Sequence, residues 1–172
     1  RYEPITGAFT EYGLTTSSAP FWLALGPDGR VWATELQSDR IAIITPSSGA
    51  VRELPTPDQG TPTGIAVGAS GTVWFVTSEG LLVMLDPASL AMHVVHLPMD
   101  NAYGVAIGPD GTIWIGSVGD MVAAYDPADG HFTTYTFAAG SGPWWPVVAP
   151  DGSIWVALAS QQGNALARII MH

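Results

Sequence analysis

Gly29-Arg30-Val31-Trp32 is the first of four short segments in which a glycine turn leads to an apolar residue and then a tryptophan. The other three are Gly71-Thr72-Val73-Trp74, Gly111-Thr112-Ile113-Trp114 and Gly152-Ser153-Ile154-Trp155. Their tryptophans lie 42, 40 and 41 residues apart along the chain. A period of about 40–45 residues that is rich in strand-forming side chains is typical of the four-stranded blades of a β-propeller. The repeat therefore predicts an all-β fold.

Each repeat divides into four strands, with the tryptophan in the second. The first, inner strand is a continuous apolar run such as Ile65–Val67, which is typical of a strand buried on both faces. A turn such as Pro109-Asp110-Gly111 follows it, because proline presets φ, aspartate bonds its own backbone and glycine accepts a positive φ. A third strand and a half-polar outer strand complete the blade. We expect one β-propeller domain over residues 1–172, with full blades at 20–55, 62–97 and 102–137.

The two ends of the chain complement each other. Residues 1–12, part of an outer half-blade at 1–16, match residues 124–135, where a third strand turns into an outer strand. Residues 143–170 supply only the three inner strands of a last blade. We expect the N-terminal strand to complete this blade, in the same chain or a partner, because the pairing removes two open sheet edges. Three arrangements stay open: four blades closed within one chain, a two-chain ring of eight blades, and part of a longer propeller.

Composition narrows the class of function. The chain has fifteen acidic side chains against five basic ones, all arginine, for a formal net charge of −10. We expect no binding to nucleic acid, which requires a basic patch, and no membrane insertion, because no apolar run is long enough for a helical span. The absence of cysteine excludes disulfides, thiolate nucleophiles and cysteine-based zinc sites. The cellular location stays open, with an extracytoplasmic or secreted protein as our expectation.

The loops that lead into the inner strands are rich in aromatic residues. In a propeller these loops meet on one face, around the central channel. The two residues before each inner run are Phe21-Trp22, Thr63-Gly64, Tyr103-Gly104 and Trp144-Trp145, and five of these eight are aromatic. Such rings either plug a narrow channel or line a mouth that binds a sugar, a flat ligand or a partner protein. The predicted ligand-binding residues are Phe21, Trp22, Glu35, Tyr103, Trp144 and Trp145.

No dense set of catalytic or metal-ligating residues stands out. The exit loops carry scattered carboxylates, whereas a hard cation needs several converging oxygens. His93, His96 and His131 map to outer strands or the turn before them, far from the channel. We therefore expect no metal and no cofactor, and Glu35 is the single catalytic candidate.

The first repeat resembles the streptogramin B lyase (virginiamycin B lyase) family. The resemblance rests on Val31-Trp32-Ala33-Thr34-Glu35, on Asp39-Arg40-Ile41-Ala42-Ile43-Ile44 and on the outer strand Arg52-Glu53-Leu54-Pro55-Thr56-Pro57, and the repeat type covers the whole chain. It implies a seven-bladed, magnesium-dependent enzyme that linearises a cyclic depsipeptide antibiotic by elimination. The family uses a glutamate three residues after the blade tryptophan, which Glu35 matches, and a histidine that leads into the inner strand.

That histidine position holds Phe21, Thr63, Tyr103 or Trp144 in this chain. Without an imidazole, no general base is poised near neutral pH. We therefore interpret the chain as a non-catalytic binding or assembly module on a lyase-like propeller. Whether it is an enzyme stays open, with a protein that is not an enzyme as our expectation. It would bind a protein partner, a second copy of itself or a small ligand at the channel face. The alternatives are a fragment or half-ring of a lyase-like enzyme and a self-assembling structural subunit.

Overall fold

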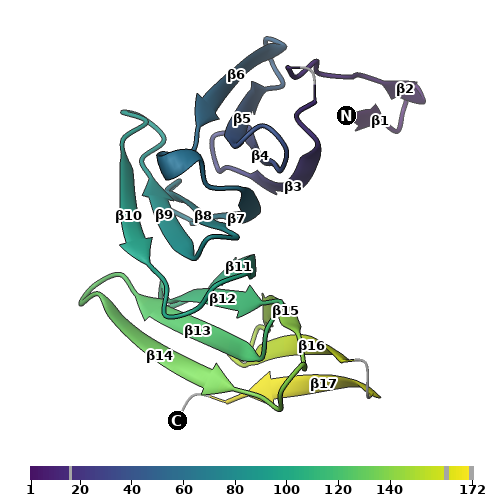
Figure 1. Cartoon of the computed structure of the whole chain (residues 1–172). Helices are drawn as coiled ribbons and strands as arrows, with labels where there is room; N and C mark the ends of the chain where they lie inside the picture. The colour runs from purple at the N-terminus through teal and green to yellow at the C-terminus, as the bar shows by residue number, and fades with distance from the viewer. Residues whose placement is uncertain (16, 161–162, 171–172) are drawn as a thin grey trace.

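The protein is built from antiparallel β-strands in a computed structural model that describes residues 1–15, 17–160 and 163–170 (Figure 1). Its main strands form four successive sheets, which we call blades 1 to 4. Blade 1 contains β3 (Pro20–Leu25), β4 (Val31–Glu35), β5 (Arg40–Thr45) and β6 (Ala50–Pro55). Blade 2 contains β7 (Pro62–Val67), β8 (Val73–Thr77), β9 (Leu81–Leu85) and β10 (Met92–His96).

Blade 3 contains β11 (Ala102–Ile107), β12 (Ile113–Ser117), β13 (Met121–Asp126) and β14 (His131–Thr136). Blade 4 has three strands, β15 (Pro143–Val148), β16 (Ile154–Ser160) and β17 (Gly163–Ile169). Among the described residues, the one helical element is the short 3-10 turn η1 (Pro57–Gln59), and no helix is long and apolar enough to cross a membrane. The all-β prediction and the four-stranded unit are confirmed.

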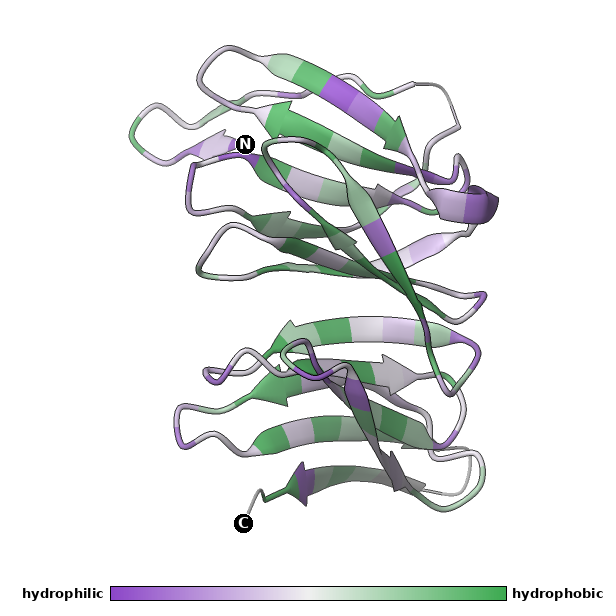
Figure 2. Cartoon of the chain, turned by 90° about the vertical axis from the view of Figure 1, so that its left-hand side faces the viewer, coloured by the Kyte–Doolittle hydropathy of each residue, from purple (hydrophilic) through white to green (hydrophobic). Residues whose placement is uncertain are grey.

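The blades follow one another around an arc, with the inner strands β3, β7, β11 and β15 toward its centre (Figure 1). Seen from the side, the sheets lie in layers with hydrophobic residues along their strands (Figure 2). An apolar cluster fills each of the three junctions between neighbouring blades. Trp32, Trp74 and Trp114 lie in these clusters and are 1%, 6% and 1% exposed. Trp155, which the repeat places in the same role, is 39% exposed because no further blade of the chain covers it.

The two ends of the arc are open within the described residues. The N-terminal strands β1 (Tyr2–Glu3) and β2 (Ala8–Phe9) pair with each other beside blade 1, and β17 is the last strand of its sheet (Figure 1). The expected pairing of residues 8–12 with blade 4 is therefore not formed within this single chain. Pairing between two chains remains a prediction.

Candidate aromatic binding site

Each of the four inner strands contains an irregularity at the two positions singled out in the sequence. The ladder between the inner and tryptophan strands shifts register between Pro20 and Leu23 in blade 1, and at the matching positions of the other three blades. The residues inside the shift are Phe21-Trp22, Thr63-Gly64, Tyr103-Gly104 and Trp144-Trp145. A bulge redirects side chains away from the regular alternation of a strand. This local geometry gives the aromatic residues an orientation that strand alternation alone does not predict.

Glycine is required at the second bulge position in blades 2 and 3, because neighbouring inner strands approach closely there. A Cβ on Gly64 would lie 2.4 Å from the carbonyl oxygen of Tyr103, and one on Gly104 would lie 2.4 Å from that of Trp144. Real side chains do not reach such distances from a backbone atom, so only glycine fits without displacement. The corresponding positions in blades 1 and 4 hold Trp22 and Trp145.

Buried threonines join the inner strands of blades 1 to 3. The Thr34 hydroxyl accepts a hydrogen bond from the backbone N–H of Trp22 at 3.0 Å and donates one to the carbonyl of Thr63 at 2.8 Å. The Thr63 hydroxyl in turn donates to the carbonyl of Ala102 at 2.9 Å. Both threonines are buried, so these bonds satisfy polar backbone groups at the centre of the arc. We predicted no role for either threonine from the sequence, although Thr63, in the otherwise apolar inner strand of blade 2, is a usable signal.

Five aromatic rings meet at this centre, and we call Phe21, Trp22, Tyr103, Trp144 and Trp145 the aromatic cluster. Trp22 from blade 1 stacks on Trp145 from blade 4 with ring centroids 4.3 Å apart and planes inclined by 19°. Tyr103 from blade 3 lies edge-on to Phe21 and to Trp145, with centroids 5.5 Å apart in both pairs. The Trp144 ring is tilted against that of Tyr103, with centroids 5.5 Å apart.

The cluster is packed but not sealed. Trp22 is 43% exposed and Phe21 is 37% exposed, whereas Tyr103, Trp144 and Trp145 are half-buried. Rings that are held by their neighbours yet partly open to water present a rigid apolar surface at low entropic cost. All five aromatic residues predicted from the sequence are thus brought together.

Glu35, the sixth predicted site residue, has a different environment. It ends β4 opposite Arg40, and its side chain is fully buried. The Ser38 hydroxyl donates to its Oε2 at 2.6 Å, but its Oε1 has no hydrogen-bond partner among the described residues. Burial raises the pKa of Glu35, and the nearby Glu53 carboxylate adds to the rise against the opposing bond from Ser38. Glu35 therefore contributes no exposed surface to the aromatic cluster.

Glu53 shows the opposite electrostatic behaviour. The hydroxyl and the backbone N–H of Thr15 both donate to its carboxylate, and Arg40 lies 3.3 Å from it. The hydrogen bond from the Thr15 hydroxyl is the main reason why the pKa of Glu53 is lowered. The two carboxyl groups therefore differ because one is desolvated and the other is bound by donors.

The residues present do not fit the magnesium ion that the family resemblance implies. Within the described parts of the chain, no three side chains from histidine, cysteine, aspartate and glutamate lie close enough to hold a metal ion. His93 and His96 lie on the outer strand β10, and His131 begins the outer strand β14, as the repeat predicted. No catalytic step through a metal follows from this arrangement.

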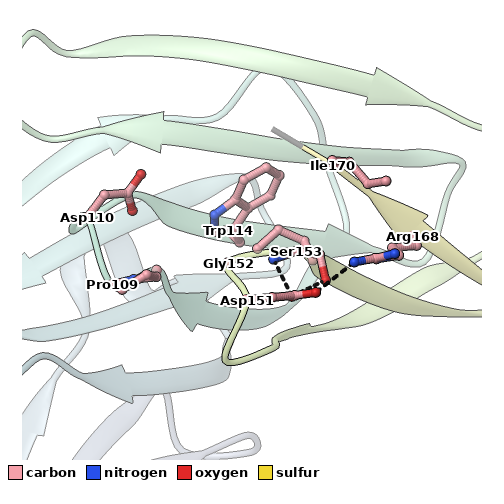
Figure 3. A pocket seen from close by; sticks show the side chains of 10 residues that line it. Pro109, Asp110, Trp114, Asp151, Gly152, Ser153, Arg168 and Ile170 are labelled. Atoms are coloured by element: carbon pink, nitrogen blue, oxygen red, sulfur yellow. Dashed lines mark hydrogen bonds and ion pairs between the residues drawn. The ribbon is translucent and has the colours of Figure 1, made fainter. Parts of the chain in front are cut away.

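Apart from the aromatic cluster, a groove lies between the turns of blades 3 and 4, at the opposite end of the inner strands from the cluster (Figure 3). Asp151 accepts hydrogen bonds from Ser153 and pairs with Arg168 at 2.7 Å, while Asp110 lines the same groove from the turn of blade 3. The hydrogen bond from the Ser153 hydroxyl is the main cause of the lowered pKa of Asp151. These bonds hold the turn in shape, which agrees with the turn role predicted for the repeated aspartates.

Comparison with known proteins places the chain by its fold. No protein-family model matches it, and no curated protein sequence does either. A streptogramin B lyase structure superimposes with a TM-score of 0.81 at 21% identity, over 97% of this chain and 60% of that chain. A catalytically inactive virginiamycin B lyase from Staphylococcus aureus with quinupristin gives 0.81 at 20% identity, over 98% of this chain and 61% of the other.

Hydrazine synthase from Kuenenia stuttgartiensis gives a TM-score of 0.80 at 16% identity, over 92% of this chain and 48% of that chain. The TM-scores establish that these structures share their architecture with the chain. The sequence identities are too low to determine its activity. The chain has a lyase-like β-propeller fold, and the likeness to streptogramin B lyase that its first repeat predicts is confirmed at that level. It spans about 60% of the length of these lyase structures.

Proposed function

We propose that the chain is a non-catalytic binding module in which the aromatic cluster receives a flat, largely apolar ligand or side chain. The observation that carries this proposal is the convergence of five rings from three separate inner strands, with Phe21 and Trp22 still partly exposed. Buried aromatic anchors supply much of the energy at binding surfaces. The scattered carboxylates of the exit loops would add polar contacts around this surface.

Two features favour binding over lyase chemistry. The positions where the lyase family carries its histidine hold aromatic residues or threonine, so none of these four described positions supplies an imidazole as a general base. Glu35, the matching glutamate, is buried with its Oε2 bonded to Ser38. Neither group is arranged to move a proton on a ligand bound at the rings.

A fragment or half-ring of a lyase-like enzyme is the second candidate. The observation that favours it is the span of the chain, which covers about 60% of the streptogramin B lyase structure. In that case the missing catalytic groups would belong to blades outside these 172 residues. This candidate predicts activity only when those blades are supplied.

Quinupristin is a suitable probe, because it accompanies one of the similar lyase structures. We expect saturable quenching of tryptophan fluorescence without any change in the mass of the compound, in buffer with magnesium. Trp22→Ala and Trp145→Ala should each weaken binding by about 2 kcal/mol or more, as the loss of an aromatic anchor does. His93→Ala, on an outer strand, should bind as the unchanged chain does.

Three outcomes would contradict the binding proposal. Linearisation that is lost in Glu35→Gln would favour the lyase. Equal weakening by all three alanine variants would place the site away from the aromatic cluster. No binding at any concentration up to solubility would reject the cluster as a site for this ligand class.

A further inference from the structure

The aromatic cluster lies at one end of the inner strands, where the loops that follow the tryptophan strands begin. Thr77, the last residue of β8, pairs with Pro62 directly before the bulge of β7, and blades 1 and 3 repeat this pairing. The Ser78 N–H, in the loop after β8, donates to the carbonyl of Thr61 at 3.0 Å. We call this end of the strands the cluster end. The opposite end, which holds the tight turns of each blade, is the turn end.

The aspartates at the turn end of the four blades all bond to their own turns. Each accepts a hydrogen bond from the backbone N–H two residues further on: Asp28, Asp86, Asp110, Asp126, Asp129 and Asp151. An aspartate that bonds its own backbone in this way stabilises a turn. The fold therefore accounts for the acidic side chains at this end.

Three aspartates at the cluster end have no such use. Asp58 and Asp100 lie in the links between blades, and Asp120 lies in the loop after β12. Asp58 and Asp100 are exposed, and Asp120 is half-buried. Within the described parts of the chain, none of the three side chains accepts a hydrogen bond or forms an ion pair. Nothing in the fold accounts for these three charges.

Little positive charge offsets the carboxylates at the cluster end. Asp39 and Glu79 add two more there, and both accept a hydrogen bond from Thr61. Among the described residues Arg40 is the single arginine at this end, and it is already paired with Glu53 at 3.3 Å. The cluster end therefore keeps a negative charge, in a chain whose formal net charge is −10.

The rings of the aromatic cluster also lack a cation that two of the repeat tryptophans have. The Arg30 guanidinium lies over Trp32, with Cζ 5.1 Å from the ring centroid, and that of Arg168 lies over Trp155 at 5.5 Å. Both contacts are at the turn end, and in the described chain no arginine covers a ring of the aromatic cluster. The face of an aromatic ring carries negative potential that attracts a cation, and tryptophan does so most strongly.

We propose that the ligand of the aromatic cluster is a small, flat organic cation whose charge is spread over its plane. This inference rests on the proposed binding function and adds the sign of the ligand's charge. Trp22, which is 43% exposed, offers the largest open ring surface of the cluster, and the unpaired aspartates attract the same charge from the loops around it. A delocalised cation is weakly hydrated, as the guanidinium group is, so it leaves water readily for the rings.

Two probes of similar size and shape separate the charge of the ligand from its flatness. In mildly alkaline buffer 1-methylquinolinium is a cation, whereas 2-methylquinoline is neutral. Equilibrium dialysis with the full chain should give a dissociation constant about tenfold lower for the cation. Raising the salt concentration from about 0.05 M to about 0.5 M should reduce this preference, because salt screens the carboxylates. The neutral probe should bind equally well in both buffers.

Removing three charges at either end of the strands gives a matched pair of variants. The triple variant Asp58→Asn, Asp100→Asn, Asp120→Asn should weaken binding of the cation about threefold and leave 2-methylquinoline unaffected. The control variant carries the same change at the turn end, at Asp86, Asp110 and Asp126. An asparagine oxygen still accepts the backbone bond of each turn, so the control should keep its fold and bind both probes as before.

Trp22→Ala separates a failure of this inference from a failure of the binding site itself. It should weaken both probes about tenfold, since either one uses the ring. Equal affinity for the two probes, with that loss intact, would overturn the cationic ligand and leave the aromatic site in place. Equal weakening by the two triple variants would also overturn it, because the charge would then act from no particular end. No binding of either probe would reject the aromatic site as well.

Discussion

Blades 3 and 4 each have one face that carries the repeat tryptophan, and equivalent strands build the two faces. Only the face of blade 3 is buried. Trp114 is 1% exposed because blade 4 packs on it, whereas Trp155 is 39% exposed at the end of the arc. The same contrast holds for Val122 and Leu166, at 0% and 73%. The position of a residue in the repeat thus determines which face of the sheet its side chain lies on. The presence of a neighbouring repeat determines whether that face is buried.

The largest expected difference between the two faces comes from removing their tryptophans. Trp114→Ala should lower the free energy of unfolding by about 3–5 kcal/mol, because it leaves a large cavity in a closed junction. Trp155→Ala should cost about 1 kcal/mol in the monomer, since much of its surface is already in water. Urea denaturation of the two variants measures both losses. Equal losses would show that Trp155 is as well packed as Trp114.

The next effect concerns glycines at the centre and at the N-terminal end. Gly104→Ala should destabilise the chain by about 1–3 kcal/mol, because its Cβ would lie 2.4 Å from the carbonyl oxygen of Trp144 in the next blade. Gly13→Ala is the matched control, since nothing lies within 4 Å of the corresponding Cβ and its φ is not positive. It should be neutral or slightly stabilising. Melting curves of the two variants measure the difference, and a stable Gly104→Ala chain would contradict the close approach of β11 and β15.

The repeat spacing and the turn residues were sufficient to predict the strands, because both are local properties of the sequence. The convergence of Phe21, Tyr103 and Trp145 also followed, since loops into inner strands meet on one face. The stacking of Trp22 on Trp145 was not predictable, because it depends on bulges and on the curvature of the whole arc. These are properties of the assembled blades.

The burial of Glu35 was beyond sequence reasoning for a similar reason. The backbone of Leu36 and Gln37 bonds back to Ala19 and Ser18, so a connection from before β3 folds against the loop after β4. The sequence places Glu35 in a polar exit loop and gives no sign of this contact. An assignment by motif position alone therefore gives no sign that this carboxyl group is buried.

A third prediction uses this buried group. Its pKa is raised above the usual 4.5, so the native state holds the proton more tightly than the unfolded state does. The stability that Glu35 contributes is complete below about pH 4.5 and is lost as the pH rises through the native pKa. Glu35→Gln should therefore raise the free energy of unfolding by about 1 kcal/mol at pH 7–8, with a higher melting temperature. At pH 4 it should have little effect.

Glu53→Gln should behave in the opposite way, which makes it the matched control. Its lowered pKa means that the stability it contributes is present above pH 4.5 and is lost as the pH falls through the native pKa. The substitution should therefore reduce the melting temperature at pH 7 and lose that effect in acid. Parallel pH profiles for the two variants would contradict the assigned environments.

The smallest effect compares two arginines in nearly identical settings at a closed junction and an open end. Arg30 pairs with Asp28 at 2.6 Å and lies over Trp32, and Arg168 pairs with Asp151 at 2.7 Å and lies over Trp155.

Arg30 makes a further contact across the junction, because its guanidinium also donates to the carbonyl of Pro87 in blade 2 at 3.1 Å. Arg30→Met should therefore cost about 1 kcal/mol, and Arg168→Met should cost about 0–0.5 kcal/mol in the monomer, as exposed ion pairs do. Urea midpoints of the two variants resolve this difference, and raising the salt concentration should diminish the Arg168 effect further. If both substitutions cost the same, the bond across the junction contributes nothing, and only apolar packing distinguishes the closed junctions from the open ends.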